Sequence, residues 1–274
     1  MHGISTYPKL EEIEPIVNAM KQKGITTLRA SFNPSFISGT HPYDKRIIQK
    51  FLDVAPQNFK VIVDRIHLFT TGQSGNEAQL KNNLQTAYSH TQEVINDFKN
   101  NSRVWIETVN EYPGTDQQRI HQNFIDFVRA RCTNPVGFNK FRSGWYDVKG
   151  PAFAGDHYYF GPTGSCWSVA SAIRDVKAGI ARGYNIINTE CGASWEEASG
   201  FTPQNVNYLN EFIRQSSALN SEALIWNRYG LQNWQAYESF GLTFPTPTAP
   251  GIEINPEAAV AAIAAIALAL GLKD

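Results

Sequence analysis

Short apolar runs alternate with longer amphipathic stretches along the chain. Eight of the apolar runs predict β-strands, and they cover residues 2–5, 25–32, 59–69, 103–110, 135–141, 152–160, 184–190 and 223–226. Between most of them, apolar residues recur at intervals of three and four, which predicts α-helices. This order of strand and helix predicts a parallel sheet, because parallel strands need long crossover connections.

Local signals mark where several helices begin and end. Gly24 ends the first predicted helix, at a position where glycine commonly closes a helix. Asp44 precedes the second helix as an N-cap, and Thr202 followed by Pro203 begins a later one. The chain between residues 141 and 152 is too short for a full helix, so we expect a loop or a single turn there.

Eight strands alternating with helices predict a (β/α)8 TIM barrel, an α/β fold, with an abbreviated fifth βα connection. The 274 residues fit a single domain of this kind, which we expect to span residues 1–274. The alternative is an open, doubly wound sheet. That fold carries a glycine-rich phosphate loop after its first strand, and the sequence lacks one.

The two ends of the chain bear on the location of the protein. Residues 258–272 are apolar and Ala-rich but shorter than the ~18–20 residues of a membrane span. We therefore expect a final packing helix there. The first residues contain no basic segment followed by an apolar run, so no signal peptide is recognisable.

The composition narrows the class of ligand. The formal net charge is -1, which argues against a nucleic acid or an anionic membrane surface as partner. Charged residues make up 18% and aromatic residues 12%, which suits a neutral, polar, ring-shaped ligand. The hydrophobic fraction of 42% is enough for a sizeable core, in which we expect most of the aromatic side chains.

Three cysteines, Cys132, Cys166 and Cys191, are widely spaced in the sequence. They form no Cys-x-x-Cys pair, so neither a zinc ribbon nor a thioredoxin-like motif is present. At most one disulfide can form within the chain, and the sequence leaves open whether Cys166 and Cys191 pair.

Two glutamates stand at the ends of predicted strands. Glu111 follows the fourth strand and Glu190 ends the seventh, and neither has a Lys or Arg beside it in the sequence. A buried carboxylate is costly unless it is used or paired, and barrel enzymes carry their active site at the carboxyl ends of the strands. Two carboxyl groups held there at ~5–5.5 Å suit glycoside hydrolysis with retention of configuration.

The pair Asn110-Glu111, together with Glu190, resembles clan A of the glycoside hydrolases, the retaining (β/α)8 group. The resemblance implies that Glu111 is the acid/base, that Glu190 is the nucleophile, and that Asn110 binds the sugar 2-hydroxyl. The two carboxyl groups would then need different environments, so that one is protonated while the other is ionised.

Further residues in order along the chain are similar to the family 5 cellulase-like branch: Arg29 in the second strand, His67 ending the third, His157 and Tyr159 in the sixth, and Trp226 ending the eighth. The resemblance implies that Arg29 lies near the nucleophile and that Tyr159 hydrogen-bonds it. It also implies that Trp226 stacks under the cleaved sugar. His67 and His157 would bind hydroxyl groups or tune Glu111.

The sequence departs from the family pattern in places. Tyr112 stands between Glu111 and Pro113, where the family has proline directly after glutamate. Asp64 lies three residues before His67, which places it on the other face of a regular strand. Tyr112, Trp167, Trp195 and Trp234 are candidates for outer sugar subsites.

We therefore expect a retaining, endo-acting β-glycanase that hydrolyses a β-linked glucan or mannan through a covalent glycosyl-enzyme. An exo-acting β-glycosidase, a transglycosylase and a catalytically inactive carbohydrate-binding barrel are the alternatives. His67 and His157 have no third histidine with them at the strand ends, which makes a hydrolytic zinc site unfavourable. We therefore expect neither a metal nor an organic cofactor. We expect a monomer that is secreted or extracytoplasmic and binds a β-linked oligo- or polysaccharide.

Overall fold

The structure is a computed structural model that describes residues 2–32, 42–65, 77–112, 114–140, 144–161, 167–194, 201–227 and 231–244. Its strands are β1 (Gly3–Thr6), β2 (Thr27–Ser31), β3 (Lys60–Asp64), β4 (Val104–Glu107), β5 (Val136–Asn139), β6 (Phe153–Gly155), β7 (His157–Tyr159), β8 (Ile187–Gly192) and β9 (Glu222–Asn227). They form one parallel sheet in the order β6-β5-β4-β3-β2-β1-β9-β8-β7.

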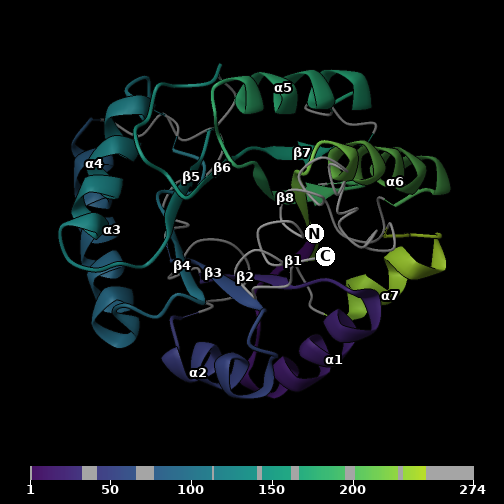
Figure 1. Cartoon of the computed structure of the whole chain (residues 1–274), viewed down its shortest axis with the longest axis horizontal. Coiled ribbons are helices and arrows are strands. Elements are labelled where there is room, and N and C mark those ends of the chain that lie inside the picture. The colour runs from purple at the N-terminus through teal and green to yellow at the C-terminus, as the bar shows by residue number, and fades with distance from the viewer. Residues whose placement is uncertain are drawn as a thin grey trace, which may run out of the picture.

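The sixth predicted strand is divided in two. β6 pairs with β5, whereas β7 pairs with β8, and Asp156 is the single residue between them. The two short strands therefore join the ends of the sheet, and the strands surround a common axis (Figure 1). The predicted barrel is confirmed, with one strand interrupted where the sequence predicts a continuous one.

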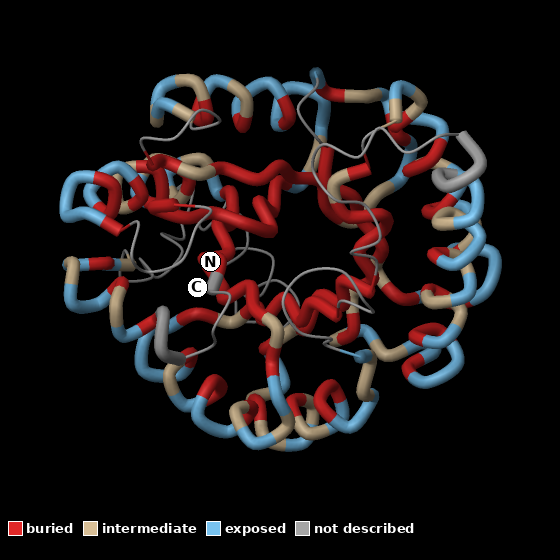
Figure 2. The backbone as a smooth tube through the Cα atoms, turned by 180° about the vertical axis from the view of Figure 1, so that it is seen from behind, coloured by how far each residue is buried: buried red, intermediate tan, exposed pale blue. Residues whose placement is uncertain are grey.

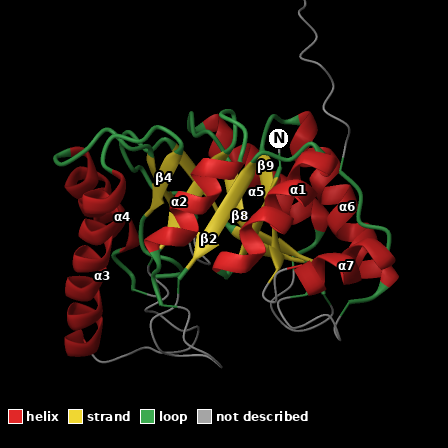
Figure 3. Cartoon of the chain, turned by 90° about the horizontal axis from the view of Figure 1, so that it is seen from below, coloured by secondary structure: helices red, strands yellow, loops and turns green. Residues whose placement is uncertain are grey.

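The helices form the outer layer of the molecule, as Figures 1 and 3 show. They are η1 (Leu10–Glu12), α1 (Ile13–Lys23), α2 (Lys45–Val54), α3 (Glu77–Phe98), α4 (Gln117–Arg129), α5 (Val169–Ala181), α6 (Pro203–Ala218) and α7 (Leu231–Ser239). The described residues between β5 and β6 contain no helix, which agrees with the predicted short connection. α7 is a helix that the sequence pattern does not predict.

The predicted helix ends have a local physical cause. Gly24 adopts a left-handed backbone (φ 66°) at the end of α1, and its N–H bonds to carbonyl groups of the last turn. The side chains of Asp44 and Thr202 accept backbone N–H groups at the starts of α2 and α6. The predicted Ala-rich helix at 258–272 lies outside the described residues.

Side chains alternate between the barrel interior and the helix layer, because successive residues of a strand point to opposite faces. Ile62, Phe153, Ile187 and Leu224 form an apolar cluster across the interior. Outward residues of the same strands pack under the helices in the largest core cluster. Figure 2 shows this buried inner ring and the exposed outer faces of the helices.

Polar layers lie on either side of this apolar layer. At the amino ends of the strands, which we call the lower end, Lys60 pairs with Glu222 at 2.8 Å. At the carboxyl ends, which we call the upper end, Arg29 is surrounded by carboxylates. Among the described residues, no helix is long and apolar enough to cross a membrane.

Two of the three cysteines are described. Cys132 and Cys191 are both buried and carry free thiols. Cys166, the third cysteine, lies outside the described residues.

Candidate active site

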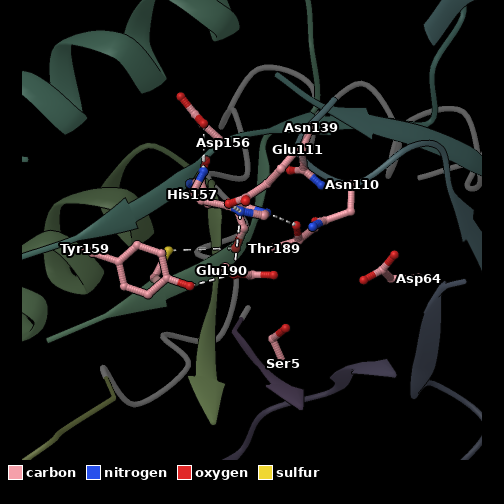
Figure 4. A network of polar contacts seen from close by, with 12 residues as sticks. Ser5, Asp64, Asn110, Glu111, Asn139, Asp156, His157, Tyr159, Thr189 and Glu190 are labelled. Atoms are coloured by element: carbon pink, nitrogen blue, oxygen red, sulfur yellow. Dashed lines mark hydrogen bonds and ion pairs between the residues drawn. The ribbon is translucent and has the colours of Figure 1, made fainter. Parts of the chain in front are cut away.

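The upper end of the barrel brings together most of the residues that the sequence singles out. Arg29, Asn110, Glu111, His157, Tyr159 and Glu190 lie in one network of polar contacts. They come from β2, β7, β8 and the turn after β4 (Figure 4). Parallel strands thus deliver residues that are distant in sequence to the same edge of the sheet.

Glu190 is held by donors on both of its carboxylate oxygens. Arg29 Nη1 donates to Oε1 at 2.6 Å, and the phenol of Tyr159 donates to Oε2 at 2.5 Å. The Glu190 side chain is only 6% exposed. Burial and the neighbouring Glu190 charge raise the pKa of Tyr159 well above its ordinary value. The phenol therefore keeps its proton and remains a hydrogen-bond donor. These contacts favour an ionised and immobile Glu190.

A register irregularity turns Glu190 into the barrel. In a regular strand, Thr189 and Glu190 would point to opposite faces. Here Thr189 Oγ1 lies 3.2 Å from the ring of His157, while Glu190 reaches Arg29. The pairing of β8 with β9 shifts between Asn188 and Cys191. Such a bulge lets two successive side chains face the site.

His157 lies between the two glutamates. Its Nδ1 is 2.9 Å from Glu111 Oε1 and 3.5 Å from Glu190 Oε2. Burial disfavours the charged ring, but Glu190 and Glu111 outweigh this effect and raise the pKa of His157 to about 9. At neutral pH the charged ring therefore donates from Nδ1 to Glu111.

The two glutamates have different surroundings. Glu111 is 21% exposed and follows β4 in a turn, whereas Glu190 is within a strand and nearly covered. Glu111 also has a left-handed backbone, with φ 45°, which is uncommon for a residue other than glycine. One oxygen of Glu111 and one of Glu190 lie within 4.8 Å of each other. Neighbouring carboxyl groups in unlike environments can hold different protonation states.

Arg29 is the centre of a second group of contacts that sequence reasoning missed. Its Nε and Nη2 donate to both oxygens of Glu107, at 2.6 and 2.9 Å. Asn139 Nδ2 donates to Glu107 as well, at 2.5 Å. The signal was present, because Glu107 shares the inward phase of its strand with Trp105. The family resemblance, however, singles out Asn110 and Glu111 in this segment and not Glu107.

Asp64 lies inside the barrel, beside Arg29. The distance from Arg29 Nη2 to Asp64 Oδ2 is 2.9 Å, and both side chains are fully buried. Asp64 is in phase with the inward Ile62, which explains its position. Arg65, the next residue, faces outward and pairs with Glu93 on α3.

Two of the predicted aromatic residues lie at the upper end. Trp226, near the end of β9, is 9% exposed, and its ring meets Tyr7 edge to face at a centroid distance of 5.2 Å. The backbone N–H of Trp167 donates to the carbonyl of Tyr159, and its ring packs edge-on against Tyr158. His67 and Trp195, also predicted for the site, lie outside the described residues.

The structure argues against two of the predicted outer subsites. Tyr112 is 3% exposed, packs in a cluster with Val109 and Ile120, and donates to Asp116. A ring that is already covered cannot also stack on a sugar. Tyr112, the residue that departs from the family pattern, is therefore a packing residue in this structure.

Trp234, the other of these two predicted subsites, is also buried, and it lies far from the two glutamates. It is 3% exposed and stacks on Phe244, whose ring contacts His2 just before β1. Together with residues 21–24 of the chain, it lines a cavity of about 490 Å³. Because α1 ends there and β2 has yet to begin, this cavity lies toward the lower end and away from Glu111 and Glu190.

Glu111, His157 and Glu190 could together offer three ligand atoms to a metal ion. Both oxygens of Glu190 already accept strong hydrogen bonds, however, and the raised pKa of His157 favours an imidazolium that cannot ligate. Arg29 would also repel a cation at this point. The set suits proton transfer between carboxyl groups better than metal binding.

Comparison with known families identifies the class of the protein. The family model described as cellulase (glycosyl hydrolase family 5) matches residues 1–136, a segment that contains Arg29 and the pair Asn110-Glu111. With the barrel described above, this match supports a glycoside hydrolase. Its family resemblance is to glycosyl hydrolase family 5, the cellulase family, as the order of the site residues predicts. No curated protein sequence matches the chain significantly.

Solved structures share the fold at low sequence identity. A GH5-4 broad specificity endoglucanase from Clostridum cellulovorans is 14% identical, with a TM-score of 0.61, and the match covers 89% of this chain and 90% of that one. A β-mannanase from Streptomyces thermolilacinus, solved with mannohexaose, is 14% identical with a TM-score of 0.59 over 83% and 78% of the two chains. A GH5-4 endoglucanase from Ruminococcus champanellensis with bound cellotriose is 15% identical, with a TM-score of 0.56 over 84% and 82%.

Proposed function

We propose that this glycoside hydrolase is a retaining, endo-acting β-glycanase that cleaves a β-linked glucan or mannan through a covalent glycosyl-enzyme. The observation that carries the proposal is the approach of Glu111 and Glu190 oxygens to within 4.8 Å. Retaining enzymes hold their two carboxyl groups ~5–5.5 Å apart, whereas inverting enzymes need ~6.5–9.5 Å to admit a water molecule.

In the first step, a Glu190 oxygen attacks the anomeric carbon while the bond to the leaving sugar breaks. Arg29 and Tyr159 aim the attacking carboxylate and keep it ionised. The leaving oxygen takes a proton from Glu111. His157 holds a proton 2.9 Å from Glu111, so the pair carries the proton that this departure requires.

In the second step, Glu111 acts as the base. It removes a proton from a water molecule, whose oxygen attacks the anomeric carbon and displaces Glu190. Two displacements at the same carbon restore the starting configuration. Asn110, held by Arg29 at 2.8 Å, is placed to bind the 2-hydroxyl group of the sugar.

Support for the substrate class comes from several directions. Two of the similar structures, a β-mannanase with mannohexaose and an endoglucanase with bound cellotriose, were solved with β-linked oligosaccharides. The near-zero net charge fits an uncharged polymer, and Trp226 stands near the end of β9, the strand beside the one that carries Glu190. A polymeric substrate outside the cell also supports a secreted or extracytoplasmic location, which we propose.

Substitution of the two glutamates tests the mechanism. We expect Glu190→Ala and Glu111→Ala each to lower kcat/KM on the cleaved polymer by at least about 1,000-fold. The exposed Glu11 gives a matched control, and Glu11→Ala should retain activity. Full activity in either site variant would refute the assignment.

Azide distinguishes the roles of the two residues. With an activated substrate, Glu190→Ala and azide should yield a glycosyl azide of inverted configuration, because azide takes the place of the nucleophile. Glu111→Ala should yield the retained configuration, because azide then attacks the glycosyl-enzyme. An NMR analysis in which both variants give the same anomer would contradict the assigned roles.

A polymer screen tests the substrate and the mode of action. Glucan, mannan, xylan and galactan are incubated with the enzyme, and products are separated by size. Mixed oligomers from glucan or mannan are expected. Monomer alone would establish the exo-acting alternative, longer products a transglycosylase, and binding without turnover an inactive carbohydrate-binding barrel.

A further inference from the structure

The guanidinium of Arg29 is shared unequally among its carboxylate partners. Two of its nitrogens, Nε and Nη2, donate to the two oxygens of Glu107, while only Nη1 donates to Glu190. Asp64 adds a further ion pair at 2.9 Å. All of these side chains are buried, so solvent screens their interactions weakly. The paired, fork-like contact, which is the strongest geometry, thus belongs to Glu107.

The contacts of Glu107 indicate an ionised carboxylate. Its hydrogen-bond partners are donors: Arg29 Nε, Arg29 Nη2 and Asn139 Nδ2. A protonated carboxyl group would bring a hydrogen that meets no acceptor among them. Burial raises the pKa of Glu107, but the charge and hydrogen bonds of Arg29 oppose this effect. The geometry favours the charged form at neutral pH.

Several elements contribute charge around Glu190. The groups that face it are Arg29 from β2, His157 and Tyr159 from β7, and Glu111 after β4, while Glu107 and Asp64 act on it through Arg29. Glu107 is the partner that takes the largest share of Arg29. Its negative charge lowers the net positive potential that Arg29 presents to Glu190.

This potential has opposite effects on the two tasks of a nucleophile. A positive neighbour keeps the carboxylate ionised. The charge of Glu190 is lost, however, as its bond to the anomeric carbon forms. An interaction that stabilises only the starting anion raises the barrier of that step. An Arg29 without Glu107 would hold Glu190 too firmly.

We propose that Glu107 is a positioning residue that limits how strongly Arg29 holds Glu190 and so keeps the nucleophile reactive. The proposal rests on the function proposed above, with Glu190 as nucleophile. It assigns to a buried carboxylate that never touches the sugar a measurable effect on the rate and its pH dependence.

The test is the variant Glu107→Gln, which removes the charge and nearly preserves the size. A dinitrophenyl β-glycoside of the sugar found in the polymer screen serves as substrate, because its leaving group needs no proton from Glu111. The acidic limb of the kcat/KM profile then reports ionisation of Glu190. We expect this limb to move about one unit to lower pH, and kcat/KM on its plateau to fall on the order of tenfold.

Glu222→Gln is the matched control, because it neutralises a buried carboxylate at the lower end of the same barrel. We expect it to leave the acidic limb in place. Folding of each variant is checked by circular dichroism. Should Glu107→Gln fail to fold, Asp64→Asn removes another charge from Arg29 and should move the limb in the same direction.

The outcomes separate this inference from the proposed function. Absence of hydrolysis by the unaltered enzyme would overturn the proposed function. If the unaltered enzyme is active, a folded Glu107→Gln or Asp64→Asn variant whose acidic limb is unmoved would overturn the role of Glu107 alone. A purely structural role would lower stability or activity without moving the limb.

Discussion

The two ends of the barrel interior solve the problem of buried charge differently. At the lower end, one cation meets one anion: Lys60 pairs with Glu222, which also accepts from the hydroxyl of Thr27. Trp105 covers the Lys60 ammonium, with its ring centroid 4.2 Å away. Lys60 and Glu222 are each other's ionic partner, and no second charged side chain is paired with either among the described residues.

At the upper end, cations are shared. Two of them, Arg29 and the imidazolium of His157, face four carboxylates: Asp64, Glu107, Glu111 and Glu190. The balanced ion pair of the lower end fills the barrel interior and links strands. The excess of carboxylates at the upper end allows protons and charge to be redistributed among them. The comparison teaches that the imbalance of charge coincides with the end of the barrel at which we propose the active site.

Among variants that alter the shared cations of the upper end, the largest effect is expected from Arg29→Lys. An ammonium group keeps the charge but cannot form a fork to Glu107 and also reach Glu190 and Asn110. We expect kcat/KM to fall by at least about 100-fold, since Asn110 and the proposed nucleophile Glu190 both lose their alignment. Steady-state kinetics on the cleaved polymer measure it, with circular dichroism to verify folding. A loss below fivefold would show that sharing is unimportant there.

The lower end should respond in stability and not in catalysis. Lys60→Met leaves Glu222 buried without its cation, and we expect unfolding in urea to become easier by about 3–5 kcal/mol. Replacement of both partners, Lys60→Met with Glu222→Leu, should recover most of that loss, because no unpaired charge remains. Both variants should keep kcat/KM within about twofold at a temperature where they are folded. A large change in kcat/KM would erase the distinction between the ends.

Stability against pH gives a smaller test of the upper end. The pKa of His157 is raised from 6.5 to about 9, so its ion pairs stabilise the fold fully below pH 6.5. That stabilisation is lost as the pH rises through about 9. The difference in free energy of unfolding between the unaltered protein and His157→Gln should therefore shrink by on the order of 2 kcal/mol from pH 6 to pH 10.

His121 provides the opposite case outside the barrel interior. It is fully buried and neutral, bonded to the hydroxyl of Thr108, and burial lowers its pKa to about 3. It favours the folded state above pH 6.5, and this contribution is lost as the pH falls toward 3. His121→Phe should therefore make the free energy of unfolding fall less between pH 6.5 and acid pH. Its dependence on pH above 6.5 should be unchanged. Urea denaturation at several pH values measures this. An equal change in the pH dependence of stability on the acid and the alkaline side would contradict the prediction.

The sequence predicts the barrel because strand and helix periodicities are local properties. The runs that became β1 to β9 are apolar regardless of their partners, and Gly24, Asp44 and Thr202 act within their own helix ends. Glu111 and Glu190 could be found because each follows an apolar run. Their meeting at one edge then depends only on parallel strand order.

Other features depend on partners that a single sequence does not display. The bulge that turns Glu190 inward is a matter of register between β8 and β9. Asp156, at the break between β6 and β7, accepts a hydrogen bond at 2.5 Å from the buried Lys140, which is distant in sequence. Tyr112 resembles an exposed loop residue in sequence, but neighbouring helices cover it. These are tertiary effects, which override local pattern.

The left-handed backbone of Glu111 sets a limit on how this enzyme can be improved. Such a conformation costs a residue other than glycine on the order of 1–3 kcal/mol. Glycine or asparagine at this position would relieve that cost. A library selected only for thermal tolerance is therefore expected to accumulate such residues at position 111 and to lose the proposed acid/base with them. Screens for robustness need a concurrent selection for turnover at this position.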